Sequence, residues 1–127
     1  MKHKLVLLVD DDADNNFVNA WILKKEFAEE VEAKQSAQEA IEYLRQRSNL
    51  RLELPSVIFL DIRMPIMDGF AFLDEFEKLS SHVKENCKIV MLSSSFDKSD
   101  YNRAMDNSHV VKYINKPLTP EALNDIK

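Results

Sequence analysis

Apolar runs recur along the chain, and stretches with helical spacing follow them. Three of the runs have no polar break, which is typical of strands that are covered on both faces of a sheet. Val31–Gln35 is short and partly polar, so it is predicted to be an edge strand. The segments predicted as strands are Leu5–Val9, Val31–Gln35, Val57–Leu60, Lys88–Leu92 and Val110–Ile114.

The first helix is expected to be capped by Asp14 or Asn15 and to run to about Phe27. Its apolar residues recur at helical spacing, so they should form the face that packs against the sheet. Trp21, spaced with Phe17, is therefore expected in the core. The predicted apolar face consists of Phe17, Val18, Trp21 and Ile22.

Capping signals place further helices. Ser36 to Glu39 reads Ser-Ala-Gln-Glu, which is a capping box. Thr119 followed by Pro120 is typical of an N-cap and a first helical position. Two more helices are expected, from Phe70 to near Ser80 and from Asp97 to about Asn107.

Strand and helix therefore alternate five times. This order favours an α/β fold with a parallel sheet and helices on both faces. A length of 127 residues suits one domain, which is predicted to span residues 1–127.

The composition of the chain argues against several classes of function. A net charge of −5 makes nucleic acid a poor partner. The apolar run Leu5–Val9 is too short for a signal-peptide core or a membrane span, so a cytoplasmic protein without membrane contact is expected. The single cysteine, Cys87, excludes an intramolecular disulfide, and the single glycine, Gly69, excludes a glycine-rich phosphate loop.

Functional groups follow four of the five predicted strands. Asp10 and Asp11 follow the first strand, Asp61 the third, Ser93 the fourth, and Lys116 lies just beyond the fifth. In a parallel sheet these strand ends share one edge, where ligands of open α/β sheets bind. We therefore expect these side chains to converge.

The converging groups favour phosphoryl transfer. Clustered carboxylates repel one another unless a cation lies among them, and Mg²⁺ takes oxygen ligands. The ammonium of Lys116 and the hydroxyl of Ser93 both suit phosphate oxygens. Because an aspartate can accept a phosphoryl group covalently, Asp61 is the candidate acceptor.

At these residues the chain resembles the receiver domain of two-component response regulators, such as the chemotaxis regulator. The resemblance covers the whole chain and rests on four motifs in the family's order and spacing. It implies a flavodoxin-like (βα)5 sandwich with strand order 2-1-3-4-5. The motifs are VDDD at Val9–Asp12, DIRMPIMDG at Asp61–Gly69, MLSSS at Met91–Ser95 and YINKP at Tyr113–Pro117.

The resemblance also implies a role for each acid at the site. Asp61 looks like the phosphorylated aspartate. Asp11 looks like the principal Mg²⁺ carboxylate, and Asp10 would help directly or through water. The backbone carbonyl of Arg63 looks like a further metal ligand.

Residues on the two later motifs match the family's switch and phosphate-binding positions. Ser93 matches the switch hydroxyl, although threonine is common there, so looser switching is expected. Tyr113 matches the aromatic switch residue, and Lys116 the phosphate-binding lysine. Pro117 matches a position where the family often has a cis peptide bond.

The predicted function is a phosphorylation-dependent switch and not an enzyme acting on other substrates. A sensor histidine kinase or a phosphotransfer protein would supply the phosphoryl group. Output would run through an output protein or a homodimer, on the face formed by the helix from Asp97, the strand Val110–Ile114 and the helix after Thr119.

Two alternatives differ in class. An aspartate-nucleophile phosphatase usually carries a second acid two residues after the nucleophile, where this chain has Arg63. A receiver-like interaction module that is never phosphorylated would not need the acids, the hydroxyl and the lysine together.

Overall fold

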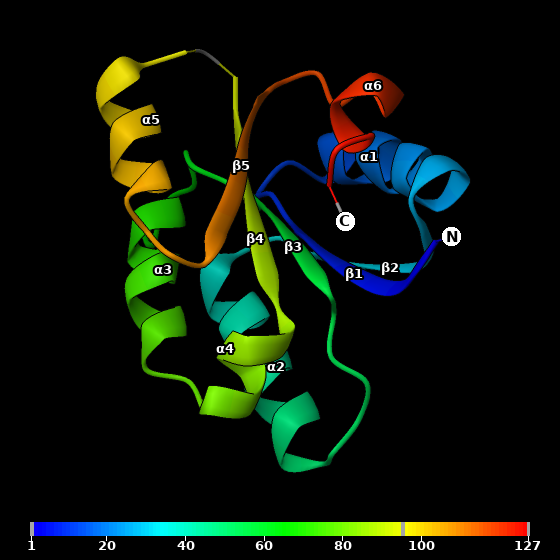
Figure 1. The fold of residues 1–127 in the computed structure, drawn as a ribbon, viewed down its shortest axis with the longest axis vertical. Coiled ribbons are helices and arrows are strands. Elements are labelled where there is room, and N and C mark those ends of the chain that lie inside the picture. Colours follow the sequence, from blue (N-terminus) through cyan, green and yellow to red (C-terminus); the bar gives the residue numbers. More distant parts are fainter. Residues whose placement is uncertain (1, 95, 127) are drawn as a thin grey trace.

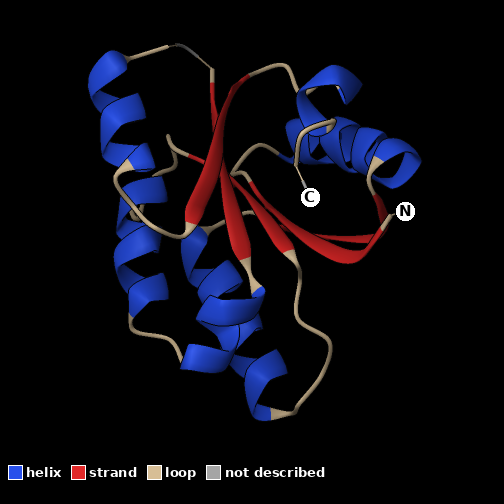
Figure 2. Ribbon diagram, in the orientation of Figure 1, coloured by secondary structure: helices blue, strands red, loops and turns tan. Residues whose placement is uncertain are grey.

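The predicted strands pair in parallel as one sheet in the residues that the computed structural model describes, 2–94 and 96–126 (Figure 1; Figure 2). The strand order β2-β1-β3-β4-β5 confirms the predicted fold class and topology. Each predicted strand is present, although β2 begins before Val31. The strands are β1 (His3–Val9), β2 (Ala28–Lys34), β3 (Val57–Asp61), β4 (Lys88–Ser93) and β5 (Val110–Asn115).

The three central strands are buried along most of their length. Every residue of β3 is buried, as are the last five residues of β1 and of β4. The edge strands β2 and β5 mix buried with exposed positions. This is the pattern expected of a parallel sheet that helices cover on both faces.

The helices form two layers, with α1 and α6 on one face of the sheet and α2, α3 and α5 on the other (Figure 1). Successive strand residues alternate between the layers. Leu8 and Phe59 pack with Leu23 of α1, whereas Leu7 packs in the cluster that contains Phe72 of α3. The helices are α1 (Ala13–Glu26), α2 (Ala37–Asn49), α3 (Gly69–Glu77), α4 (Ser81–Asn86), α5 (Lys98–Met105) and α6 (Pro120–Leu123).

The predicted packing face of α1 is wrong for three of its four residues, while Ile22 is partly buried and packs against the core as expected. Phe17 is 76% exposed and Trp21 is 61% exposed, and Val18 is exposed as well, so they lie outside the core. The residues that α1 buries are Asn16, Asn19 and Leu23.

The helix carries two stripes at helical spacing, and the stripe that ends in Leu23 and Phe27 packs against the sheet. A hydrogen bond from Asn16 Nδ2 to the carbonyl of Asp10, at 2.8 Å, is consistent with this rotation, which leaves the more apolar stripe exposed. The spacing of apolar residues along a helix does not predict a hydrogen bond of this kind.

The cap of α1 is Asp12, and the predicted caps Asp14 and Asn15 are wrong. Asp12 Oδ1 accepts hydrogen bonds from the amides of Asp14 at 2.9 Å and Asn15 at 3.2 Å. The helix therefore begins directly after the acidic residues that end β1, which places its N-terminus beside them.

Two other helices differ in extent from the prediction. α3 ends at Glu77, and Ser80 caps a separate short helix, α4, by accepting a hydrogen bond from the amide of Val83. Thr119 and Pro120 begin α6 as predicted, but this helix has four residues. Among the described residues, no helix combines the length and apolar character needed to cross a membrane.

Cys87 lies at the start of β4 and is buried. Burial raises the pKa of its thiol to about 12. The thiol therefore stays protonated at neutral pH, and Cys87 serves as an apolar residue of the core.

Candidate functional site

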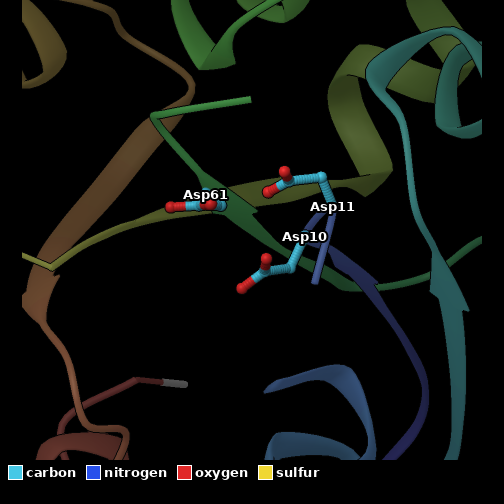
Figure 3. Close-up of side chains that lie close together, drawn as sticks. All are labelled: Asp10, Asp11 and Asp61. Carbon is cyan, nitrogen blue, oxygen red and sulfur yellow. The ribbon is translucent and has the colours of Figure 1, made fainter. Parts of the chain in front are cut away.

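Three carboxylates meet where β1 and β3 end. Val9 pairs with Leu60 in the sheet, so Asp10 and Asp61, which follow these two residues, lie on neighbouring strands. Figure 3 shows the side chains of Asp10, Asp11 and Asp61 gathered at this edge. One oxygen from each carboxylate lies within 4.8 Å of the others.

Lys116 joins two of these acids from the far end of β5. Its Nζ donates to Asp10 Oδ2 at 2.9 Å and lies 3.3 Å from Asp61 Oδ1. The backbone amide of Lys116 donates to the carbonyl of Ser93 at 2.7 Å, which fixes the end of β5 beside the end of β4. The predicted lysine therefore reaches the predicted acids, and the Lys116–Pro117 peptide bond is cis, as expected.

The cluster contains three closely spaced carboxyl groups and one ammonium group, that of Lys116. Burial raises the pKa of the Asp61 carboxyl; the Lys116 ammonium opposes this rise, while the charges of Asp10 and Asp11 add to it. For Lys116, burial alone would lower the pKa. The hydrogen bond to Asp10 and the charges of Asp61 and Asp10 outweigh burial and raise it.

Asp10 is the most constrained of the three acids. It is 1% exposed, its Oδ1 accepts from the amide of Asp12 at 2.9 Å, and its Oδ2 accepts from Lys116. Its backbone carbonyl accepts from Asn16 Nδ2. The sequence pattern did not single out Asn16, and two asparagines, Asn16 and Asn19, at helical spacing with Leu23 are the signal that could have done so.

Gly69 holds the start of α3 against the end of β3. Its amide donates to the carbonyl of Ile62 at 2.8 Å. A Cβ at this position would lie 2.9 Å from the carbonyl oxygen of Asp61 and 2.9 Å from the Cα of Ile62, so a side chain would push the two segments apart. Glycine is therefore required here by close backbone approach.

The loop between Asp61 and Gly69 contains a strained turn. The amide of Met67 donates to the carbonyl of Pro65 at 2.7 Å, and Ile66 between them has φ 69°. A positive φ is costly for a β-branched residue. Ile66 is also 95% exposed, so a strained apolar residue stands on the loop that follows Asp61.

The two predicted switch residues lie on β4 and β5. Ser93 is buried at the end of β4, beside the cluster. Tyr113 packs against the core on the α3 side, and its hydroxyl is buried with no hydrogen-bond partner in the described residues. Ser95, the last residue of the MLSSS motif, lies outside the described residues.

Arg63 reaches from the loop after Asp61 to α5. Its Nη2 donates to Asp100 Oδ2 at 2.5 Å. A second arginine connects the same helix to α3, because the guanidinium of Arg103 stacks 4.1 Å from the ring centre of Phe70. Within α5, Ala104 is the residue that is buried, and these two contacts add to the attachment that the Tyr101 ring makes to Tyr113 on β5.

The carboxylate cluster fits a hard divalent cation. The oxygens of Asp10, Asp11 and Asp61 are close enough for one ion to reach all three, and Mg²⁺ takes oxygen ligands at about 2.0–2.1 Å. The three carboxylates also outweigh the Lys116 ammonium, so the cluster keeps a negative charge that such an ion would neutralise.

Comparison with known proteins settles the family. The family model described as "Response regulator receiver domain" matches residues 6–126. The chain belongs to the response-regulator receiver family. A two-component response regulator from Cytophaga hutchinsonii has the same fold as this receiver, with a TM-score of 0.91 and 35% identity, covering 98% of this chain and 94% of that one.

Relatives of this receiver differ widely in length. The probable methanogenesis regulatory protein FilR2 of Methanothrix harundinacea is 30% identical over 124 residues, which cover 94% of this chain and 76% of FilR2. The sensor histidine kinase CheAY of Helicobacter pylori is 29% identical over 122 residues, which cover 96% of this chain but 14% of CheAY. The receiver thus corresponds to a small part of some relatives.

Proposed function

We propose that residues 1–127 form one receiver domain that works as a phosphorylation switch. Asp61 accepts a phosphoryl group from a sensor histidine kinase or a phosphotransfer protein, in the presence of Mg²⁺. The domain catalyses its own phosphorylation and dephosphorylation and acts on no other substrate. The observation that carries this proposal is the position of Lys116 Nζ, between Asp10 and Asp61 in the acidic cluster.

The transfer is a substitution at phosphorus. An Asp61 oxygen forms the new P–O bond while the P–N bond to the donor's histidine breaks, and the departing imidazole nitrogen keeps the electron pair. Negative charge spreads over the phosphoryl oxygens during this step. The Lys116 ammonium, already 3.3 Å from Asp61 Oδ1, is placed to stabilise that charge.

Asp10, Asp11 and Asp61 would hold the Mg²⁺, together with the backbone carbonyl of Arg63. When bound, the ion supplies charge neutralisation for the crowded carboxylates and the phosphoryl oxygens. Asp10 keeps its hydrogen bond to Lys116 Nζ, which orients the ammonium toward the acceptor. A phosphatase of the aspartate-nucleophile class would carry its second acid at position 63, where this chain has Arg63, whose side chain points to Asp100.

The proposal is tested by incubating the protein with acetyl phosphate and Mg²⁺ and measuring its intact mass. The expected result is a gain of one phosphoryl group, and no gain when the metal is chelated before acetyl phosphate is added. A protein that gains no phosphoryl mass from acetyl phosphate or from any histidine kinase of a purified panel would be an interaction module instead.

We propose that the output runs through the face formed by α5, β5 and α6. A cleft of about 500 Å³ lies there, beside the switch residue Tyr113. The buried hydroxyl of Tyr113 lacks a partner in the described residues, so the inward ring position costs free energy, on the order of 1–3 kcal/mol. An outward position would return that hydroxyl to water, which makes the ring a two-state element. The cleft is lined by Lys88, Tyr101, Met105, Val111, Lys112, Tyr113, Asp125 and Ile126.

Phosphorylation is expected to reach this face by two contacts. The hydroxyl of Ser93 is expected to move toward the phosphoryl oxygens and hydrogen-bond to them. This movement favours the inward position of the Tyr113 ring. The Arg63–Asp100 ion pair connects the loop after Asp61 directly to α5.

Hydrogen–deuterium exchange with and without beryllofluoride, a phosphoryl mimic, should therefore change in residues 97–118. The segment 28–49, which contains the edge strand β2 and α2, serves as the internal control and should not change. Changes confined to the loops around Asp61 would show that the output uses another face.

We propose that the exposed apolar face of α1 docks the phosphodonor protein. Phe17, Val18 and Trp21 are large and exposed. Such a patch marks an interaction surface more often than a solvated one. A cleft of about 390 Å³ connects it to the site, because its lining includes Val18 on α1 and Lys116 and Pro117 beyond β5. A phosphodonor protein bound to α1 would therefore lie next to Lys116.

Trp21→Ser is expected to slow phosphoryl transfer from a protein donor at least about tenfold relative to transfer from acetyl phosphate, since aromatic anchors dominate such interfaces. The donor is the histidine kinase of the panel that phosphorylates the parent protein fastest. Leu50→Ser is the matched control, because Leu50 is 68% exposed at the end of α2, and it should leave the ratio of the two rates unaltered. An equal ratio in Trp21→Ser and the parent would remove α1 from the docking surface.

A further inference from the structure

Asn16 is a polar side chain on the buried face of α1. It is 6% exposed and shares this face with Leu23, which lies in the apolar cluster between α1 and the sheet. Its Oδ1 is buried and has no hydrogen-bond partner in residues 2–94 and 96–126. An amide oxygen left unpaired inside the protein lowers stability, so an apolar residue would serve the fold better at this position.

The other half of the same amide makes one directed contact. Asn16 Nδ2 donates to the backbone carbonyl of Asp10 at 2.8 Å, in a buried setting. The backbone amide of Asn16 also donates to the carbonyl of Asp12 at 3.0 Å, as part of the first turn of α1. The side chain therefore fixes the peptide that follows Asp10 to a rigid helix.

That peptide determines where two of the carboxylates stand. It links Asp10 to Asp11, and one oxygen from each reaches the cluster with Asp61. Asp10 Oδ2 must also meet Lys116 Nζ at 2.9 Å. A rotation of this peptide would move both acids relative to Asp61 and to the lysine.

We infer that Asn16 is a positioning residue, which lowers stability in order to hold Asp10 and Asp11 in the geometry that binds Mg²⁺ beside Asp61. This inference rests on the proposed function of the site. Groups that orient metal ligands without touching the metal commonly change metal affinity by about 10- to 100-fold when they are removed.

Asn16→Leu separates positioning from a structural role, because leucine fills the buried space and removes the unpaired oxygen. The variant is expected to melt at the same temperature as the parent or higher, yet to bind Mg²⁺ about 10- to 100-fold more weakly by calorimetric titration. Asn16→Ala is the second variant, in case leucine does not fit, and it should show the same loss of affinity. Asn19→Leu is the matched control, since Asn19 is a buried asparagine on the same face, and its Mg²⁺ affinity should equal that of the parent.

Each outcome has a separate meaning. If the parent protein binds no Mg²⁺, the proposed function fails. If the parent binds Mg²⁺ and the Asn16 variants that fold bind it equally well, Asn16 has only a structural role. A loss of affinity in Asn19→Leu as large as that in Asn16→Leu would likewise overturn the inference, because it would assign the effect to the packing of α1.

Discussion

Asp61→Asn is expected to slow phosphorylation by acetyl phosphate at least about 100-fold, because a carboxamide is a far weaker nucleophile than a carboxylate. Asp61 is the acceptor in this account: it is 5% exposed, and the Lys116 ammonium lies 3.3 Å from its Oδ1. Asparagine has nearly the same shape, so the fold should be kept. The rate of mass gain in the presence of Mg²⁺ is the measurement.

Asp68→Asn is the matched control for the loss of an acid from the same loop. Asp68 caps α3 by accepting a hydrogen bond from the amide of Ala71 at 2.9 Å, and asparagine caps helices equally well. Its phosphorylation rate should stay within about twofold of the parent's, since a surface charge change contributes little. If both variants slow to the same extent, the effect belongs to the loop and not to the acceptor.

Asp11→Ala is expected to weaken Mg²⁺ binding and to stabilise the metal-free protein. Mg²⁺ affinity should fall at least about tenfold, because a first ligand is lost. The metal-free protein should become more stable, with a melting temperature raised by a few degrees, because one of three crowded like charges is removed. The pKa of Asp61 should also move down, since the charge of Asp11 helps to raise it.

Asp14→Ala tests whether this pair of effects is specific. Asp14 lies in the first turn of α1, where a negative charge stabilises the helix dipole, so its removal should lower stability slightly and leave Mg²⁺ affinity unaltered. Thermal melting without metal and calorimetric titration with Mg²⁺ are the two measurements. If the melting temperatures of Asp11→Ala and Asp14→Ala both fall below that of the parent, repulsion among the three carboxylates does not destabilise the fold.

The strands of the sheet were predictable because the features that mark them lie within each strand and in the residue that follows it. Leu5–Val9 and Val57–Leu60 are apolar without a break, and a carboxylate follows each run. Those features give both the strand and its end. The parallel topology then brings Asp10 and Asp61 together, since β1 and β3 are neighbours.

The rotation of α1 was not predictable from periodicity. Phe17 and Trp21 repeat at helical spacing, and so do Asn16 and Leu23. The structure buries the stripe that contains Asn16 and Leu23, and the hydrogen bond from Asn16 to the Asp10 carbonyl is one of the contacts that depend on this rotation. The buried face of α1 lies next to the site through Asn16, and functional sites are where local sequence rules are most often overridden.

Two further features of the site depend on where separate elements meet. The sequence predicts that Lys116 lies near the acids, but it does not reveal that Nζ contacts both Asp10 and Asp61, because this geometry follows from how β5 ends beside β4. Nor does it reveal that Arg63 pairs with Asp100, which lies on a helix far along the chain. Such pairings are set by three-dimensional packing.

The most direct test of the central claim is to locate the phosphoryl group. The protein is phosphorylated with acetyl phosphate and Mg²⁺, treated with borohydride, which converts an aspartyl phosphate into homoserine, and digested for peptide sequencing by mass spectrometry. Homoserine is expected at position 61. Homoserine at Asp10, Asp11 or Asp12, with Asp61 recovered unchanged, would contradict it.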